Sequence, residues 1–261
     1  MRTPCAVPLW QCLRRAVLCS LPLIAGCFAT VASRCPACVE LSQASLGSLP
    51  PETQRLFILV PGLLGYGHEW NAAQIELLHH PEIAVLVYSW EPWQSLERSG
   101  RTMARVLSEV DRRLPVGVRD VTVIAHSAAG MIAVEAAGSV DTPLRRPLHI
   151  VAVGAPLAGL GYYPEPPNLR RTPLAMVLGG RFTEWPAPRP GIEIRVFPTS
   201  ADDPVMRRIG QHNPADPRVL PKQARLEYLP ADLGHNSALG WLCHRLLHSD
   251  PSDAAPNRGT Q

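Results

Sequence analysis

Ser127 is the residue of this sequence best placed to do chemistry, because it lies between a strand-like run and a helix-like run. Val121–His126 is apolar like a buried strand, and Ala128–Gly130 opens the helical stretch. A serine hydroxyl becomes a nucleophile when a sharp strand-to-helix turn exposes it and a base takes its proton. The small side chains of Ala125 and Ala129 would let the two backbones approach at such a turn. We expect a nucleophilic serine; an ordinary strand followed by a helix cap is the alternative.

An acid and a base follow the serine, each just after a predicted strand. Gly191–Phe197 alternates like a strand and runs into a turn that contains Asp202 and Asp203. Another short strand, Arg225–Leu229, precedes the loop that contains His235. An imidazole can accept the serine proton while a carboxylate fixes its tautomer and stabilises its cation. Serine, acid and histidine therefore occur in that order, and either aspartate is a candidate for the carboxylate.

A third candidate element lies upstream of the serine. The apolar strand Arg55–Val60 ends in Pro61-Gly62-Leu63-Leu64-Gly65, where small residues leave backbone N–H groups free to point at an anion. The glycine spacing is not G-x-G-x-x-G, and no Gly-Lys-Ser/Thr follows. We therefore expect this turn to bind an oxyanion and not a phosphate.

These motifs, in this order, resemble those of the bacterial lipases and esterases of the α/β-hydrolase superfamily. Ile150–Gly159 is also similar to that family's strand after the nucleophile helix. The chain departs from the family at Pro61, where the family's oxyanion loop has histidine, and at Ala129, where the nucleophile turn has glycine. The resemblance covers about residues 55–247. It implies an α/β-hydrolase fold with a mostly parallel sheet of about six or more strands and helices on both faces.

The resemblance also implies a role for each candidate residue. Ser127 would attack a carboxylic ester, and His235 would take and return the proton. Asp202, whose Asp-x-x-Val context is similar to that of small lipases, would orient the histidine. The backbone amides of Leu63 and Ala128 would form the oxyanion hole. An acyl-enzyme would form, with no metal or organic cofactor.

Two other functions are compatible with the same residues. Acyl transfer or thioester cleavage would use the same triad and differ in the acceptor and the pocket. A non-catalytic envelope binding protein of this fold belongs to another class, and the departures at Pro61 and Ala129 motivate it. Reaction with a probe that needs an activated serine distinguishes the binding protein from the enzymes.

The elements that must position these residues follow an alternating pattern. Strand-like runs recur near residues 56, 84, 121, 149, 192 and 226, with helix-like stretches between them. This alternation is typical of a parallel sheet with helices on both faces. The clearest helix is predicted over Ser95–Leu114, with one apolar face that covers the sheet. His126 lies on a predicted strand, so we expect a buried core histidine there and not a catalytic one.

A long insertion interrupts the pattern between the strand near residue 149 and the one near residue 192. Residues 157–190 are rich in proline and aromatic residues. The family often has a cap at this point, so we expect a cap-like insertion that lines an apolar acyl pocket; a proline-stiffened surface loop is the alternative. The whole hydrolase domain is predicted over residues 55–248, with a flexible tail over residues 249–261.

The N-terminal segment indicates export. After two arginines, Ala16–Ile24 forms an apolar run too short to span a bilayer as a helix. The following Ala-Gly-Cys27 resembles a bacterial lipobox, in which the cysteine is lipidated and becomes the N-terminus. We expect a lipoprotein-type signal peptide over residues 1–26, a lipid on Cys27, a tether over residues 27–54 and a place in the bacterial cell envelope. The alternative is cleavage near Ala32 and a freely secreted protein.

The composition is that of one soluble globular domain, with 46% apolar and 18% charged residues in 261. Three arginines and no acidic residue precede Cys27, so the formal charge falls from +3 to 0 once this segment is removed. A neutral domain without Lys/Arg runs excludes a nucleic-acid partner. The expected partners are a small-molecule or lipid ester and, through the anchor, a membrane.

The remaining cysteines and histidines give weaker signals. Cys35 and Cys38 could form a local disulfide in an oxidising envelope, whereas a thioredoxin-type motif should open a helix. Cys243 is expected to be buried on the last helix. His244 and His248 lie one helical turn apart beside it, a spacing that would suit zinc. The surface of a terminal helix explains the same pattern, so we expect no metal.

Overall fold

The computed structural model describes residues 39–41, 46–63, 70–91, 94–140, 143–159, 184–199, 216–230, 233–234 and 237–248. The strands are β1 (Val39–Glu40), β2 (Arg55–Val60), β3 (Ile83–Val87), β4 (Asp120–His126), β5 (Leu148–Val153), β6 (Ile192–Phe197) and β7 (Arg225–Leu226). The α-helices are α2 (Asn71–Leu78), α3 (Leu96–Arg113), α4 (Ala128–Ser139) and α6 (Ala238–His248). Short 3-10 helices, η1 (Leu46–Ser48) and η4 (Pro217–Val219), complete the described elements.

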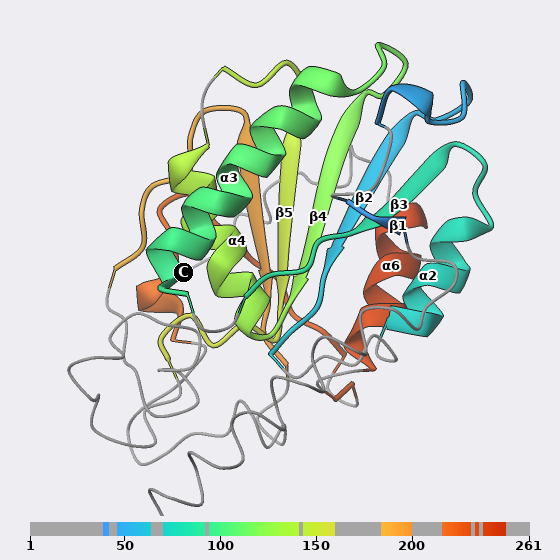
Figure 1. The fold of residues 1–261 in the computed structure, drawn as a ribbon. Coiled ribbons are helices and arrows are strands. Elements are labelled where there is room, and N and C mark those ends of the chain that lie inside the picture. The colour runs from blue at the N-terminus through green and yellow to red at the C-terminus, as the bar shows by residue number, and fades with distance from the viewer. Residues whose placement is uncertain are drawn as a thin grey trace, which may run out of the picture. The chain divides into compact units, whose positions relative to one another are not determined.

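The described strands form one parallel sheet in the order β1-β3-β2-β4-β5-β6-β7 (Figure 1). Each neighbouring pair is parallel, so the carboxyl ends of all strands lie at one edge. The six strands expected from the sequence correspond to β2–β7. The central strands β2 and β4 are buried along almost their whole length, as expected where helices cover both faces. The predicted α/β fold is confirmed.

Alternation along β2 divides the core into two layers. Leu56, Ile58 and Val60 pack into the cluster that contains the buried faces of α3 and α4. Phe57 and Leu59 point to the other face, where they join residues of α2 and α6. Figure 1 shows the same arrangement, with α3 and α4 over one face of the sheet and α2 and α6 side by side on the other.

The predicted helix over Ser95–Leu114 is confirmed as α3. The Ser95 hydroxyl accepts a hydrogen bond of 3.2 Å from the Arg98 N–H, which caps the helix at its first turn. Its residues Met103, Leu107 and Val110 are buried in the same cluster as side chains of β2 and β4. This helix therefore has the covering role that its apolar face indicates.

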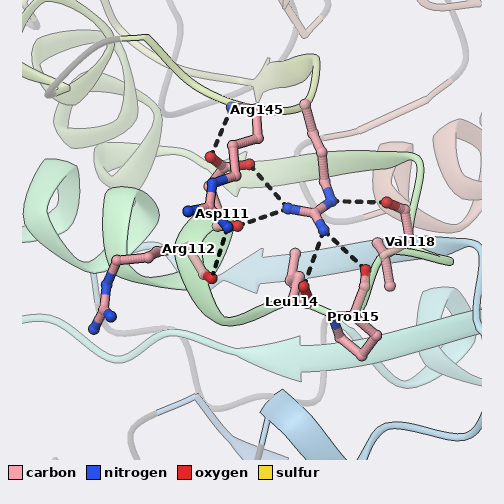
Figure 2. A network of polar contacts seen from close by, with 7 residues as sticks. Asp111, Arg112, Leu114, Pro115, Val118 and Arg145 are labelled. Carbon is pink, nitrogen blue, oxygen red and sulfur yellow. Dashed lines mark hydrogen bonds and ion pairs between the residues drawn. The ribbon is translucent and has the colours of Figure 1, made fainter.

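Arg146 joins the C-terminal end of α3 to the start of β5, and Figure 2 shows Asp111, Leu114, Pro115 and Val118, whose carbonyl oxygens it binds. Its guanidinium donates hydrogen bonds of 2.6, 2.9, 2.8 and 2.7 Å to the carbonyl oxygens of Asp111, Leu114, Pro115 and Val118. Asp111 lies in the last turn of α3, where carbonyls lack intrahelical donors, and the other three carbonyls follow the helix, so one side chain binds both the helix end and the segment after it. Because β4 and β5 begin here, the contact fixes the amino edge of the sheet, opposite the edge that bears Ser127.

Part of the predicted tether, residues 27–54, contributes to the domain. Val39–Glu40 forms β1 beside β3, and the side chains of Leu41 and Leu46 are buried in the core. Two residues are too few to show the alternation of a strand, so the sequence pattern does not predict β1, and its pairing with β3 defines it. Cys27, Cys35 and Cys38 lie outside the described residues, as do 1–26, 160–183 and the tail 249–261. No helix among the described residues is long and apolar enough to cross a membrane.

Cys243 is buried on α6, as the sequence predicts. Burial raises the pKa of its thiol to about 12, with a smaller contribution from the charge of Glu76. The thiol therefore stays protonated at neutral pH and cannot serve as a nucleophile.

Candidate active site

Ser127 has the backbone conformation of a sharp strand-to-helix turn. Its φ is 54° and its ψ is −126°, so it is one of two described residues other than glycine with a positive φ. Its N–H donates to the Val153 carbonyl at 2.8 Å, and its carbonyl accepts from the Gly130 N–H at 3.0 Å. These bonds hold the turn between β4 and α4 in a conformation that costs about 1–3 kcal/mol.

The hydroxyl of Ser127 does not cap the helix that follows. The first residue before α4 makes no side-chain capping hydrogen bond, and its backbone is outside the extended region that capping residues use. Every residue of Val121–Ala137 is buried except Ser127, which is partly exposed. The alternative of an ordinary helix cap is therefore wrong for Ser127. The turn lifts one side chain out of an otherwise buried segment.

Gly130 allows α4 to pack closely on the end of β5. A Cβ at this position would lie 2.4 Å from the Cβ of Ala155, a distance that no side chain tolerates. Ala129, which stands where the resembled family has glycine, is buried. The close approach in this chain thus falls at Gly130, so the alanine at 129 does not prevent the turn.

The predicted oxyanion loop lies against the serine turn. Val60 at the end of β2 is paired with Ala125 of β4, so Pro61–Leu63 leaves the sheet next to Ser127. A Cβ on Gly62 would lie 2.9 Å from the Ser127 Cβ and 3.2 Å from the His126 carbonyl oxygen. Only glycine fits this contact without a shift of the backbone.

Trp90 also binds this loop. Its indole N–H donates a hydrogen bond of 2.7 Å to the Pro61 carbonyl oxygen. Pro61 cannot supply the bracing side chain that the resembled family has at this position. Trp90 follows β3, 29 positions along the chain, and supplies a bond to the loop from there. Sequence reasoning missed this residue because nothing local relates it to Pro61.

His126 is buried on β4, as expected. Its ring lies edge-on to that of Trp70, with the ring centroids 6.3 Å apart. A Cβ on Gly62 would lie 3.3 Å from its Nδ1, so the imidazole packs beneath the oxyanion loop. It lies against Gly62 and does not reach the surface.

The predicted acid and base, Asp202 and His235, lie outside the described residues, and so does Asp203. The structure does describe the elements that lead to them. Phe197, the last residue of β6, is paired with Val153, whose carbonyl binds Ser127. The segment toward Asp202 thus leaves the same edge of the sheet as the serine turn. Helix α6 begins three residues after His235.

Glu227 ties these two elements together. Its carboxylate accepts a hydrogen bond of 2.9 Å from Arg195 of β6 and lies 3.1 Å from the Arg245 guanidinium of α6. Burial by itself would raise the pKa of Glu227, but the hydrogen bond and charge of Arg195 outweigh it, with help from Arg245 and Arg225, and lower the pKa. The ionised carboxylate therefore links β6, which precedes the segment with Asp202, to α6, which follows the segment with His235.

The strand order, the parallel pairing and the positive φ of Ser127 decide the fold. It is an α/β-hydrolase fold. In this fold, the nucleophile turn follows a central strand, and the oxyanion loop follows the neighbouring strand. The residues that this structure brings together are Ser127, Leu63 and Ala128, from two adjacent strand ends. Ala128 is the first residue of α4, where backbone N–H groups lack intrahelical acceptors and the helix dipole favours negative charge.

Several solved structures are similar to this chain, among them the following three. The poly(3-hydroxybutyrate) depolymerase LpqC from Bordetella parapertussis is 16% identical with a TM-score of 0.45, over 77% of this chain and 82% of its own. A putative cell surface hydrolase from Lactobacillus plantarum WCFS1 is 9% identical with a TM-score of 0.46, over 78% and 96%. An esterase domain of a Rhodothermus marinus protein is 16% identical with a TM-score of 0.40, over 75% and 84%.

No protein-family model and no curated protein matches the chain. The three likenesses are distant, so they assign neither substrate nor catalytic residues. The fold assignment rests on the chain's own strand order and on the turn at Ser127.

Proposed function

We propose that this protein is a serine hydrolase that cleaves carboxylic esters through an acyl-enzyme. The observation that carries the proposal is the turn at Ser127, where a strained backbone exposes one hydroxyl within a buried segment. Proteins retain such strain mainly at functional sites. A structural serine would gain stability from a relaxed turn, and a nucleophile gains access to the substrate carbonyl.

In the proposed reaction the Ser127 oxygen attacks the ester carbonyl carbon and its proton passes to His235. The carbonyl oxygen becomes an oxyanion, which accepts hydrogen bonds from the backbone amides of Leu63 and Ala128. His235 returns the proton to the departing alcohol, and an acyl-serine remains. His235 then takes a proton from water, which attacks the acyl carbonyl; the serine C–O bond breaks, the carboxylic acid leaves, and the proton returns to Ser127.

The proposed role of Asp202 is to hold the imidazole of His235 in the tautomer that accepts the serine proton. The support is its position after β6, whose last residue is paired with Val153 beside the Ser127 turn. Asp202→Asn should cost far more of kcat than Asp203→Asn, because one carboxylate can face the imidazole. The reverse ranking would transfer the role to Asp203.

The test of the proposed function is a panel of p-nitrophenyl esters of graded acyl length, with the wild type and Ser127→Ala compared. The wild type should hydrolyse at least one ester, and Ser127→Ala should lose about a thousandfold or more in kcat/KM. Circular dichroism confirms that the variant is folded. Equal activity of the two proteins would contradict the proposal, and a folded wild type that hydrolyses no ester would favour a binding protein.

The proposed location is the bacterial cell envelope, with the lipid on Cys27 as the anchor. Several acyl chains anchor a protein stably, so extraction should need detergent and not salt. Cys27→Ser should move the protein from the membrane fraction to the soluble envelope fraction. A wild-type N-terminus at or after Ala32 without lipid would contradict the anchor and indicate a secreted protein.

A further inference from the structure

Helices α2 and α6 bring three side chains with metal-binding atoms to one place, remote from the Ser127 turn along the chain. The Nδ1 of His244 lies 2.9 Å from the Oε1 of Glu76, and the Nε2 of His248 lies 3.9 Å from the same oxygen. One ligand atom from each residue can be chosen so that all three lie within 4.8 Å of one another. Among the described residues, Glu76, His244 and His248 form the one group of three or more histidine, cysteine or acidic side chains whose ligand atoms lie this close together.

These separations suit one small divalent cation. Zinc binds imidazole nitrogen at about 2.0–2.1 Å and carboxylate oxygen at about 2.0–2.2 Å, so two ligand atoms in tetrahedral geometry lie roughly 3.3–3.5 Å apart. The separations of 2.9 and 3.9 Å between the imidazole nitrogens and the Glu76 Oε1 lie on either side of that value. The side chains are half-exposed or exposed, so small rotations can equalise the separations without disturbing the core.

The ligands are held by two helices that already pack together. His244 and His248 are four residues apart on α6, and their ring centroids are 4.4 Å apart, so both face the same neighbour. Glu76 is 168 positions away from His244, on α2. The sequence shows the histidine pair, but only the fold supplies the carboxylate. The sequence expectation of no metal did not include Glu76.

The donor atoms of the cluster suit a cation. The Glu76 carboxylate supplies negative charge, and the neutral imidazoles of His244 and His248 each supply a nitrogen lone pair. His80 lies nearby, with its ring centroid 6.2 Å from that of His248.

We propose that Glu76, His244 and His248 bind one divalent transition-metal ion, of which Zn²⁺ is the best match, and that this ion fastens α2 to α6. Two imidazoles and one carboxylate are a donor set that zinc uses, with water in the remaining position. Helix α2 follows the oxyanion loop, and α6 follows the loop that contains His235. The ion would thus stabilise the two helices that flank the site loops. The proposal does not depend on ester hydrolysis.

The experiment uses the full chain without a polyhistidine tag, stripped with a chelator, in a background where serine replaces every cysteine except the buried Cys243, so that no other thiol competes for zinc. Calorimetric titration with ZnCl₂ should show one site per chain. A hundredfold excess of Zn²⁺ over Kd should raise Tm by roughly 5–10 °C. A titration without binding, or binding without a rise in Tm, would overturn the proposal.

Variants locate the site. His248→Ala and Glu76→Gln each remove one ligand and should weaken zinc binding by more than the roughly 10- to 100-fold that loss of an outer partner costs. Both positions are accessible to solvent, and melting in chelator confirms that each variant folds like the parent.

The matched control is His149→Ala. His149 also pairs with a glutamate, Glu193, at 3.2 Å, but there the third neighbour is the cation of Arg225. This variant should bind zinc as the parent does. Weaker binding in His149→Ala, or unchanged binding in both ligand variants, would place the ion elsewhere and overturn the proposal.

Discussion

Gly62 and Ser127 touch across the ends of two neighbouring strands: a Cβ on Gly62 would lie 2.9 Å from the Cβ of Ser127. The proposed oxyanion loop can therefore approach Ser127, the proposed nucleophile, this closely only if position 62 has no side chain. The same contact makes position 62 sensitive to the addition of a single methyl group.

We predict that Gly62→Ala lowers kcat/KM by about 10- to 100-fold while it costs only about 1–3 kcal/mol of stability. The added methyl group must displace either the loop or the serine turn, and the amide of Leu63 moves with the loop. The measurement is kcat/KM on the best ester, with thermal unfolding alongside. Gly47→Ala is the matched control, because a Cβ at position 47 meets nothing within 4 Å. Equal effects in the two variants would show that the close contact has no bearing on activity.

The backbone strain at Ser127 predicts that the stability of a variant at this position depends on which residue replaces the serine. Glycine adopts a positive φ without cost, whereas alanine does not. We expect Ser127→Gly to be more stable than Ser127→Ala by about 1 kcal/mol, which corresponds to roughly 2–4 °C in Tm for a domain of this size. Both variants should be inactive. Identical melting temperatures would mean that the turn relaxes when the hydroxyl is absent.

Trp90→Phe should reduce kcat about tenfold and leave the fold intact. The substitution keeps an aromatic ring but removes the N–H that binds the Pro61 carbonyl, so the oxyanion loop loses its brace. The measurement is kcat and KM on an acetyl ester, because its short acyl group should depend little on the predicted cap-like insertion over residues 157–190. Trp185→Phe is the control, since it removes a similar hydrogen bond, to the Leu157 carbonyl at 3.0 Å. A kcat equal to that of the wild type would exclude Trp90 from positioning the loop.

The depressed pKa of Glu227 predicts a specific dependence of stability on pH. A carboxyl with a lowered folded-state pKa adds stability above its unfolded value, near 4.5, and this stability is lost as pH falls through the folded-state pKa. Glu227→Gln should therefore be less stable than the wild type at pH 7. The gap should shrink as pH falls below about 4.5. Urea unfolding at pH 7, 5.5 and 3.5 measures this gap, and a gap that stays constant would exclude the ionised carboxylate as its cause.

Much of the fold could be predicted because its signals are local. The strand pattern predicts β2–β7, and the apolar face predicts α3 within one residue at each end. Ser127 also stands out locally, since a strand, a small-residue turn and a helix follow one another within a short segment. Such elements are decided by neighbours in the sequence.

The contacts that sequence reasoning missed are all distant along the chain. Trp90 reaches Pro61 across 29 positions, and Arg146 reaches the end of α3 across more than 30. Glu76 meets His244 across 168. No hydrophobic period or local motif indicates such pairs, because these residues become neighbours only in the folded chain. The two-residue strand β1 was missed for the same reason, since its pairing with β3 defines it.

The most direct test of the account is covalent labelling of the folded protein with a fluorophosphonate at neutral pH. Such a probe reacts with a serine only when a base and an oxyanion site activate it. We predict one adduct per chain by intact mass, mapped to Ser127 in the peptide digest and absent from Ser127→Ala. A folded wild type that takes up no probe, or that is labelled equally in Ser127→Ala, would contradict the assignment of Ser127 as the nucleophile.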